Sequence, residues 1–232
     1  MARLDAYVPI DRRFALTSNE PLPDRAEGAV LFADISGFSS TAAALEQELG
    51  PGQGADELMI HVNQLYTELV NQVHLYGGSV IGFSGDAITC WFDQELPKQQ
   101  DAQGNSAQRA TACALAMQEV VGRIGDRELT TRTRFLLSIK VSVVAGTVRR
   151  FLVGSPHIQS LEILAGGLLE RAAAADHVLQ PGQVVVGAEV LGRFGHQLQL
   201  SEWVQGANGE HFALIAGLSE PVAPAPWPDL PH

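Results

Sequence analysis

The stretch Ala29-Val-Leu-Phe-Ala-Asp-Ile-Ser-Gly-Phe38 is an apolar run that ends in an acid. A short apolar run bounded by turn residues is typical of a buried strand. Ser36 and Gly37 interrupt this pattern, and residues 40–49 have the composition of a helix. The stretch therefore predicts a buried strand that leads almost directly into a helix, with Asp34 at the end of the strand.

The alternation of element types continues along the chain. A helix is predicted over 55–76, because apolar residues recur there every three or four positions until Gly77 and Gly78 end it. The other predicted elements are strands at 79–83 and 87–92 around the turn Ser84-Gly85-Asp86, a helix at 107–124, strands at 135–145 and 148–153 around a second hairpin turn at Gly146-Thr147, helices near 168–175 and at 188–194, and strands at 183–186, 198–204 and 211–215. This order predicts an α+β fold, a ferredoxin-like βαββαβ antiparallel sheet with helices on one face.

The two ends of the chain differ in composition from the middle. Residues 1–26 are predicted to be an irregular lead-in, since prolines interrupt any long periodicity there. Residues 27–218 form the predicted catalytic domain, and residues 219–232 are a Pro-rich linker or tail that favours an extended spacer. Because the chain stops just after such a spacer, we expect it to be part of a longer polypeptide.

Composition excludes several classes of function. The chain has 232 residues, 26 acids and 15 bases, for a net charge of −11, and such a surface repels nucleic acid. No apolar run reaches the length of a membrane span and the N-terminus lacks a signal peptide, so we expect a cytoplasmic protein without membrane contact. Cys90 and Cys113 lie in apolar segments and are predicted to be buried free thiols.

Two acids occupy positions that suit metal chemistry. Asp34 ends the first strand and Asp86 lies in the first hairpin turn, and these elements are neighbours in a ferredoxin-like sheet. Converging carboxylates suit hard divalent cations, and two such ions can assist phosphoryl chemistry. Ser36, Gly37 and Phe38 open a helix whose amides can bind phosphate. The alternative is that Asp34 caps the helix and Asp86 only shapes the turn.

These residues resemble a known family, the class III adenylate and guanylate cyclase catalytic domains. The segment 31–38 resembles the first metal motif of the family, and 76–87 resembles the second. The segment 139–148 is similar to the hairpin arm that helps to join two catalytic halves, and 164–175 falls where the second catalytic segment lies. The similarity covers about 27–186 and is strongest to the first catalytic half of soluble, bicarbonate-responsive cyclases.

The resemblance implies a reaction and a site. Asp34, Asp86 and the backbone carbonyl of Ile35 would bind two Mg²⁺ or Mn²⁺ ions. The 3′-hydroxyl of ATP would attack the α-phosphorus, which gives cyclic AMP and pyrophosphate. The family's site lies between two halves, and the complementary half supplies a base-selecting Lys together with an Asn and an Arg that stabilise the transition state.

The chain departs from the family at those complementary positions. Gly82 stands where the Lys is expected, Leu169 at the Asn and Ala173 at the Arg, while Arg171 is two residues out of register. Only Glu162 falls near the base-selecting acid position. A homodimer of the isolated chain is possible but should be nearly inactive, so the resemblance implies a non-identical second cyclase half, expected on the same longer polypeptide. Because glycine stands at position 82, the Lys expected in a bicarbonate pocket is absent as well.

Three other interpretations remain beside an adenylate cyclase half. The chain could be a non-catalytic regulatory or dimerisation module with the cyclase fold, or a guanylate-specific cyclase, since no residue settles ATP against GTP. A diguanylate cyclase is disfavoured because the hairpin Phe83-Ser-Gly-Asp-Ala87 lacks that family's paired acids.

Overall fold

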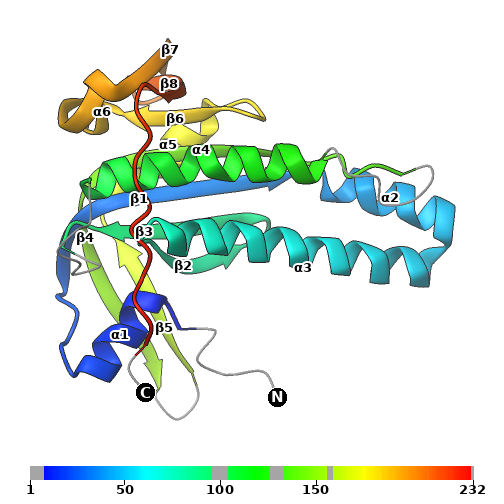
Figure 1. Ribbon diagram of the computed structural model, residues 1–232, viewed down its shortest axis with the longest axis horizontal. Coiled ribbons are helices and arrows are strands. Elements are labelled where there is room, and N and C mark those ends of the chain that lie inside the picture. Colours follow the sequence, from blue (N-terminus) through cyan, green and yellow to red (C-terminus); the bar gives the residue numbers. More distant parts are fainter. Residues whose placement is uncertain (1–7, 96–103, 126–132, 156–158, 231–232) are drawn as a thin grey trace.

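The computed structural model describes residues 8–95, 104–125, 133–155 and 159–230, and these form a mixed α+β fold (Figure 1). The helices are α1 (Ile10–Ser18), α2 (Phe38–Leu49), α3 (Pro51–Leu75), α4 (Ser106–Gly125), α5 (Gly167–His177) and α6 (Ala188–Phe194). The strands are β1 (Arg25–Ser36), β2 (Ser79–Ser84), β3 (Ala87–Asp93), β4 (Ser138–Ser155), β5 (Gln159–Ala165), β6 (Val184–Gly187), β7 (Leu198–Gln205) and β8 (His211–Leu218).

The strands form one mostly antiparallel sheet, which confirms the predicted fold class. Its order is β2-β3-β1-β4-β6-β8-β7, and β5 pairs with the outer part of β4. Among these pairs only β4 and β6 run parallel. The central strand β1 is antiparallel to both of its neighbours, from Arg25 opposite Arg149 to Ser36 opposite Ser138 on β4. Its carboxyl end therefore lies beside the β2–β3 turn.

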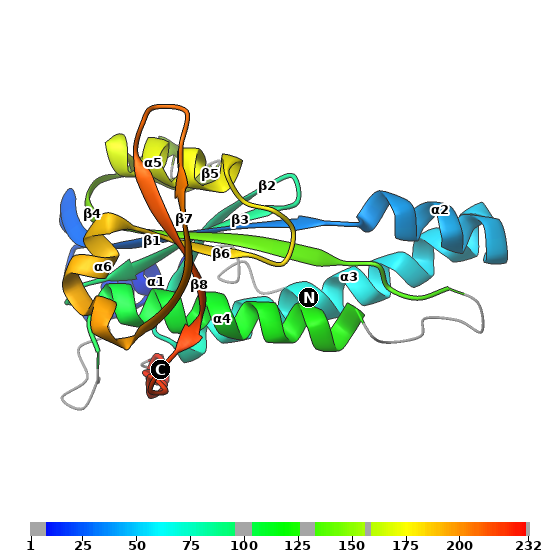
Figure 2. The ribbon, with the colours of Figure 1, turned by 90° about the horizontal axis from the view of Figure 1, so that it is seen from above.

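Helices cover both faces of the sheet, whereas the sequence placed them on one. In β1, Leu31 and Ala33 belong to the core beneath α3 and α4, and Val30 belongs to the core beneath α5. Figure 2 shows α5 on one side of the sheet and α3 and α4 on the other. Alternate residues of a strand face opposite sides, so a strand that is apolar at every position requires cover on both.

Strand β4 runs without a break through the place where a second hairpin turn was expected. Gly146 pairs with Gly28 of β1, and Thr147 pairs with Glu27. A Cβ added at Gly146 would lie 3.4 Å from the side chain of Leu168 on α5. The glycine therefore marks a close approach of helix to strand and not a turn. The hairpin that does form joins β4 to β5.

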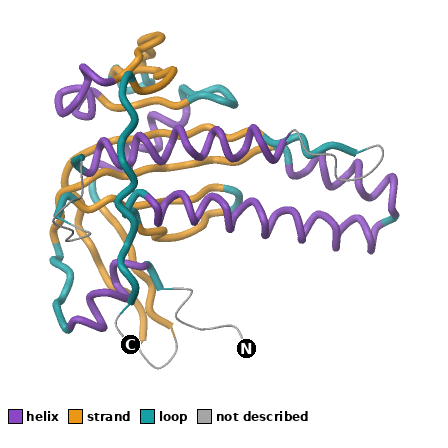
Figure 3. Tube along the Cα trace, viewed as in Figure 1, coloured by secondary structure: helices purple, strands orange, loops and turns teal. Residues whose placement is uncertain are grey.

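The described parts of the lead-in and of the tail pack against the domain. Residues predicted to be irregular form α1, and its Phe14 ring stacks on Trp227 of the Pro-rich tail with a centroid separation of 5.1 Å. The Trp227 indole donates to the Gly78 carbonyl at 2.8 Å, and the Ala225 amide donates to the Leu75 carbonyl at 3.0 Å. Figures 1 and 3 show this extended tail running across the helices toward α1.

Cys90 and Cys113 are buried free thiols, as predicted, and burial raises the pKa of both. Within the described residues, no helix is both long and apolar enough to cross a membrane.

Candidate active site

Asp34 and Asp86 lie next to each other at one edge of the sheet. Asp34 pairs with Ala87, the first residue of β3, so the preceding turn residue Asp86 lies beside the end of β1. The amide of Ile35 donates to the backbone carbonyl of Asp86 at 3.3 Å. Burial, followed by the negative charges of Asp86 and Asp34, raises the pKa of the Tyr66 phenol on α3. Both carboxylates therefore lie within electrostatic range of the Tyr66 phenol.

An aromatic cluster flanks the two acids, which sequence reasoning missed. Tyr66 stacks on Phe38 at 6.3 Å between ring centroids and meets Phe83 edge-on at 5.6 Å. Its hydroxyl donates to the Asp86 carbonyl at 3.4 Å. Phe38, Val62, Tyr66, Gly85 and Asp86 line an open hollow of about 510 Å³. Helical periodicity identified this side of α3 only as core, because the partner of Tyr66 lies twenty residues away in another element.

The donor set suits a hard divalent cation. Asp34 and Asp86 are both accessible to solvent and offer carboxylate oxygens, whereas Ile35, whose carbonyl is the third expected ligand, is buried. Magnesium is commonly held by one or two carboxylates with the remaining ligands supplied by substrate phosphates and water. In the described part of the chain, no group of three or more His, Cys, Asp or Glu gathers into a closed metal site. Ions at this edge would therefore complete their coordination with water or with oxygens of a bound ligand.

The helix that follows β1 begins at the same edge. Gly37 has φ 106°, and a Cβ there would lie 1.8 Å from the Leu136 carbonyl oxygen, so the position requires glycine. The N-terminus of α2 has no side-chain cap, which leaves its first amides open to an anion. The Ser36 hydroxyl lies 2.8 Å from that of Ser138. The structure thus brings the expected phosphate-binding segment, 36–38, beside Asp34.

A lysine that the sequence did not assign to the site contacts Asp34 directly. Lys140 lies opposite Asp34 in the β1–β4 register, and its Nζ is 3.0 Å from Asp34 Oδ2 and 2.9 Å from Asp176 Oδ2 on α5. Burial lowers the pKa of Lys140, but the two carboxylates outweigh it, and the net shift is upward. The only signal in the sequence was a single cation within an apolar strand.

Comparisons with known proteins agree with this architecture. No protein-family model matches the chain. Human adenylate cyclase type 10 is 22% identical over 187 residues, which cover 80% of this chain and 11% of that protein. The rabbit (Oryctolagus cuniculus) adenylate cyclase type 10 is 25% identical over 134 residues, which cover 58% of this chain and 8% of that protein. The chain thus spans about a tenth of the length of these curated relatives.

Superposition on solved structures identifies the fold. The adenylyl cyclase CyaB from P. aeruginosa superposes with a TM-score of 0.69 at 18% identity, covering 86% of this chain and 98% of that one. The guanylate cyclase domain of RhGC from Catenaria anguillulae, in complex with GTP, gives a TM-score of 0.65 at 15% identity, covering 84% and 100%. This chain has the nucleotide cyclase fold. The resemblance drawn from the sequence motifs is confirmed, and the neighbours include both adenylyl and guanylyl cyclases.

Two positions of the cyclase fold that were expected to be degenerate lie on one side of α5. Leu169 is half-buried and Ala173 is exposed, and a spacing of four residues places them on the same helix face. Arg171 is not available to replace either of them, because it is paired with Glu189 and Glu210. On β2, Gly82 lies at a register shift with open space around it, and it has no side chain to offer.

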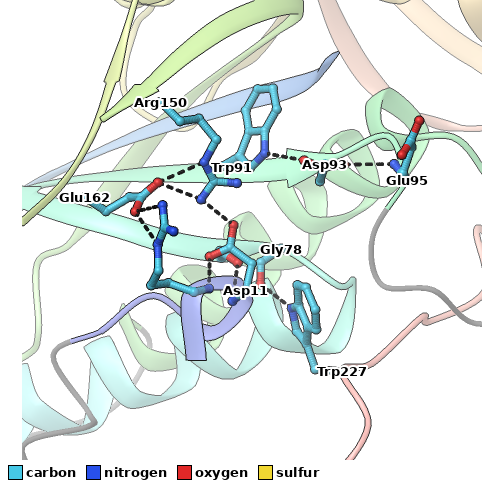
Figure 4. A network of polar contacts seen from close by, with 10 residues as sticks. Asp11, Gly78, Trp91, Asp93, Glu95, Arg150, Glu162 and Trp227 are labelled. Carbon is cyan, nitrogen blue, oxygen red and sulfur yellow. Dashed lines mark hydrogen bonds and ion pairs between the residues drawn. The ribbon is translucent and has the colours of Figure 1, made fainter. Parts of the chain in front are cut away.

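Glu162 does not join the acids of the cyclase edge. It is buried on β5, where Oε1 accepts from Arg150 Nε at 2.9 Å and Oε2 accepts from Arg12 Nε at 2.8 Å. Arg150 also bonds Asp11 at 2.7 Å, so two cations and two anions tie α1 to the β4–β5 hairpin (Figure 4). A buried carboxylate whose two oxygens are both paired cannot bind the base of a nucleotide. The expectation that Glu162 selects the base is not supported, and we assign it a structural role.

Proposed function

We propose that this chain is the metal-binding half of an adenylate cyclase, which converts ATP to cyclic AMP and pyrophosphate. The observation that carries the proposal is the placement of Asp34 and Asp86 beside each other at the end of β1, with the open N-terminus of α2 next to them. The similarity to proteins named adenylate cyclase type 10 favours ATP as the substrate. We also propose a cytoplasmic location.

The chain's own residues would share two tasks. Asp34, Asp86 and the Ile35 carbonyl would hold two Mg²⁺ or Mn²⁺ ions, which supply the positive charge that activates the 3′-oxygen and offsets charge on the phosphates. The amides that begin α2 would orient phosphate oxygens by hydrogen bonds and by the helix dipole. Together they neutralise a polyphosphate locally on a chain whose net charge is −11.

A second, non-identical half would complete this site. Leu169 and Ala173 cannot donate a hydrogen bond to the transition state, and Gly82 cannot select a base. The β4–β5 hairpin offers a surface for such a partner, because large apolar side chains on it are 40–57% exposed. They are Phe151, Leu152, Val153, Leu161 and Ile163. An exposed apolar cluster of this kind is typical of a protein interface.

Two other functions each have one observation in their favour. Guanylate cyclase activity is favoured by the guanylyl cyclases among the structural neighbours. A non-catalytic regulatory module is favoured by the apolar residues at 169 and 173. The adjacent Asp34 and Asp86 favour catalysis, since a scaffold gains nothing from two neighbouring carboxylates.

The test of the proposal is cyclic nucleotide formation by the chain alone. With Mn²⁺ and ATP, we expect binding of the nucleotide but turnover at least about 10²-fold below that of a complete site, because the donors at 169 and 173 are missing. Mass spectrometry measures cyclic AMP formed from ATP and, in a parallel reaction, cyclic GMP formed from GTP, across a wide range of protein concentration.

Two outcomes would contradict parts of this proposal. Turnover that rises with the square of concentration and disappears in Asp34→Ala would show a catalytic homodimer, and no partner half would then be needed. Cyclic GMP formed from GTP in excess of cyclic AMP would overturn the choice of substrate.

A further inference from the structure

We infer that Lys140 is an internal counter-ion that competes with the divalent cation for Asp34, and that Asp176 is the positioning residue that draws Lys140 away from it. The inference rests on the proposed function, since it takes Asp34 as a metal ligand. It concerns how strongly this chain binds metal, which the reaction itself does not fix.

The geometry places one ammonium between two carboxylates. The Lys140 Nζ lies at nearly the same distance from Asp34 Oδ2 and Asp176 Oδ2, 3.0 and 2.9 Å. Asp34 and Lys140 are cross-strand neighbours, so the backbone of two paired central strands fixes their separation. Asp176 comes from a third element, the last turn of α5. The ammonium can therefore shift between its two partners by side-chain rotation alone.

Asp176 can accept one more hydrogen bond from the Lys140 ammonium than it accepts in this structure. Its side chain is 10% exposed, and its Oδ1 is buried without a hydrogen-bond partner among the described residues. An ionised carboxylate at such depth is costly unless a cation compensates it. Lys140 is the cation that contacts Asp176 here. Closer association of Lys140 with Asp176 would use the oxygen that is now unpaired.

The charges around Asp34 make the position of Lys140 matter for metal binding. A divalent cation on Asp34 would lie within a few ångströms of the ammonium and be repelled by it. When Lys140 moves toward Asp176, the Asp34 oxygen is released and the repulsion falls. Asp176 therefore favours the metal-bound state through Lys140 without contacting the metal.

The test is Mn²⁺ binding to the full chain without nucleotide, followed by the electron paramagnetic resonance signal of free Mn²⁺. We expect Lys140→Met to bind Mn²⁺ about tenfold more tightly than wild type, because a repelling charge is gone. We expect Asp176→Asn to bind about threefold to tenfold more weakly, because the ammonium then remains on Asp34. Lys140→Gln is the second variant if the first unfolds.

Matched controls separate this effect from a change in net charge. Arg123→Met removes an exposed cation from α4, and Glu202→Gln removes an exposed acid from β7. Each should leave the Mn²⁺ dissociation constant within about twofold of wild type, since solvent screens distant charges.

A double-mutant cycle tests whether Asp176 acts through Lys140. In the Lys140→Met background, Asp176→Asn should no longer weaken Mn²⁺ binding. An equal loss in both backgrounds would overturn the positioning role. An unchanged affinity in Lys140→Met and Lys140→Gln would overturn the counter-ion role.

Asp34→Asn distinguishes failure of this inference from failure of the proposed function. If Asp34→Asn abolishes Mn²⁺ binding and the Lys140 variants bind like wild type, the metal site stands and the inference fails. If Asp34→Asn changes nothing, the proposed metal site itself is wrong.

Discussion

The paired substitution Leu169→Asn with Ala173→Arg is expected to raise cyclic AMP formation by the chain about 100-fold over its own baseline. Removing one donor that stabilises developing charge typically costs about 10²–10³ in rate, so restoring such donors should return a factor of that order. The exposed side of α5 accepts both side chains, because Ala173 is exposed and Leu169 is only half-buried. The measurement is initial rate with Mn²⁺ and ATP at high protein concentration.

Two controls define what this gain of function means. Adding Asp34→Asn should return the rate to baseline, because the new donors serve the metal site. Glu170→Asn with His177→Arg places the same groups at other exposed positions of α5 and should leave the rate unchanged. A rise in that control, or a rise that survives Asp34→Asn, would contradict the assignment of positions 169 and 173.

Replacing Arg150 with methionine is expected to lower the free energy of unfolding by about 3–5 kcal/mol. The side chains of Arg150, Asp11 and Glu162 are each 1% exposed, and Arg150 contacts both acids. Its removal leaves Asp11 without its cation and Glu162 with Arg12 alone (Figure 4). An uncompensated buried charge, more than the lost contacts, sets the size of the effect.

Urea unfolding of the full chain provides the measurement. The matched control is Arg149→Met, because Arg149 is the exposed neighbour of Arg150 on the same strand and should change stability by less than about 1 kcal/mol. Replacing Asp11, Arg12, Arg150 and Glu162 together with leucine should recover part of the loss, since no unpaired charge then remains in the network. A loss below about 1 kcal/mol for Arg150→Met would contradict the role assigned to this network.

Local sequence signals predicted much of the fold. The apolar period of α3, the glycines that end it, and the acid in the β2–β3 turn each depend on neighbours in the chain. The helix predicted at 188–194 has the same bounds in the structure. Asp34 and Asp86 could be brought together from sequence because strand order alone makes β1 and the hairpin neighbours.

Features that depend on distant contacts could not be predicted in this way. Lys140 and Asp176 are 36 residues apart, and neither has a motif to signal the pair. The sequence predicted a turn at Gly146, because the residue that it packs against, Leu168, comes later in the chain. Glu162 lies 150 residues from Arg12, so an acid that resembled a base-binding residue proved to be half of a buried ion pair.

The metal site at the end of β1 is tested most directly by calorimetry of Mn²⁺ binding, in the presence of ATP, to wild type, Asp34→Asn and Asp86→Asn. We expect up to two Mn²⁺ per chain for wild type and at least about tenfold weaker binding for each variant, because each removes a charged ligand. Asp56→Asn, which neutralises an exposed acid on α3, should bind like wild type. Wild-type affinity in Asp34→Asn would contradict the claim that this edge of the sheet is a cyclase metal site.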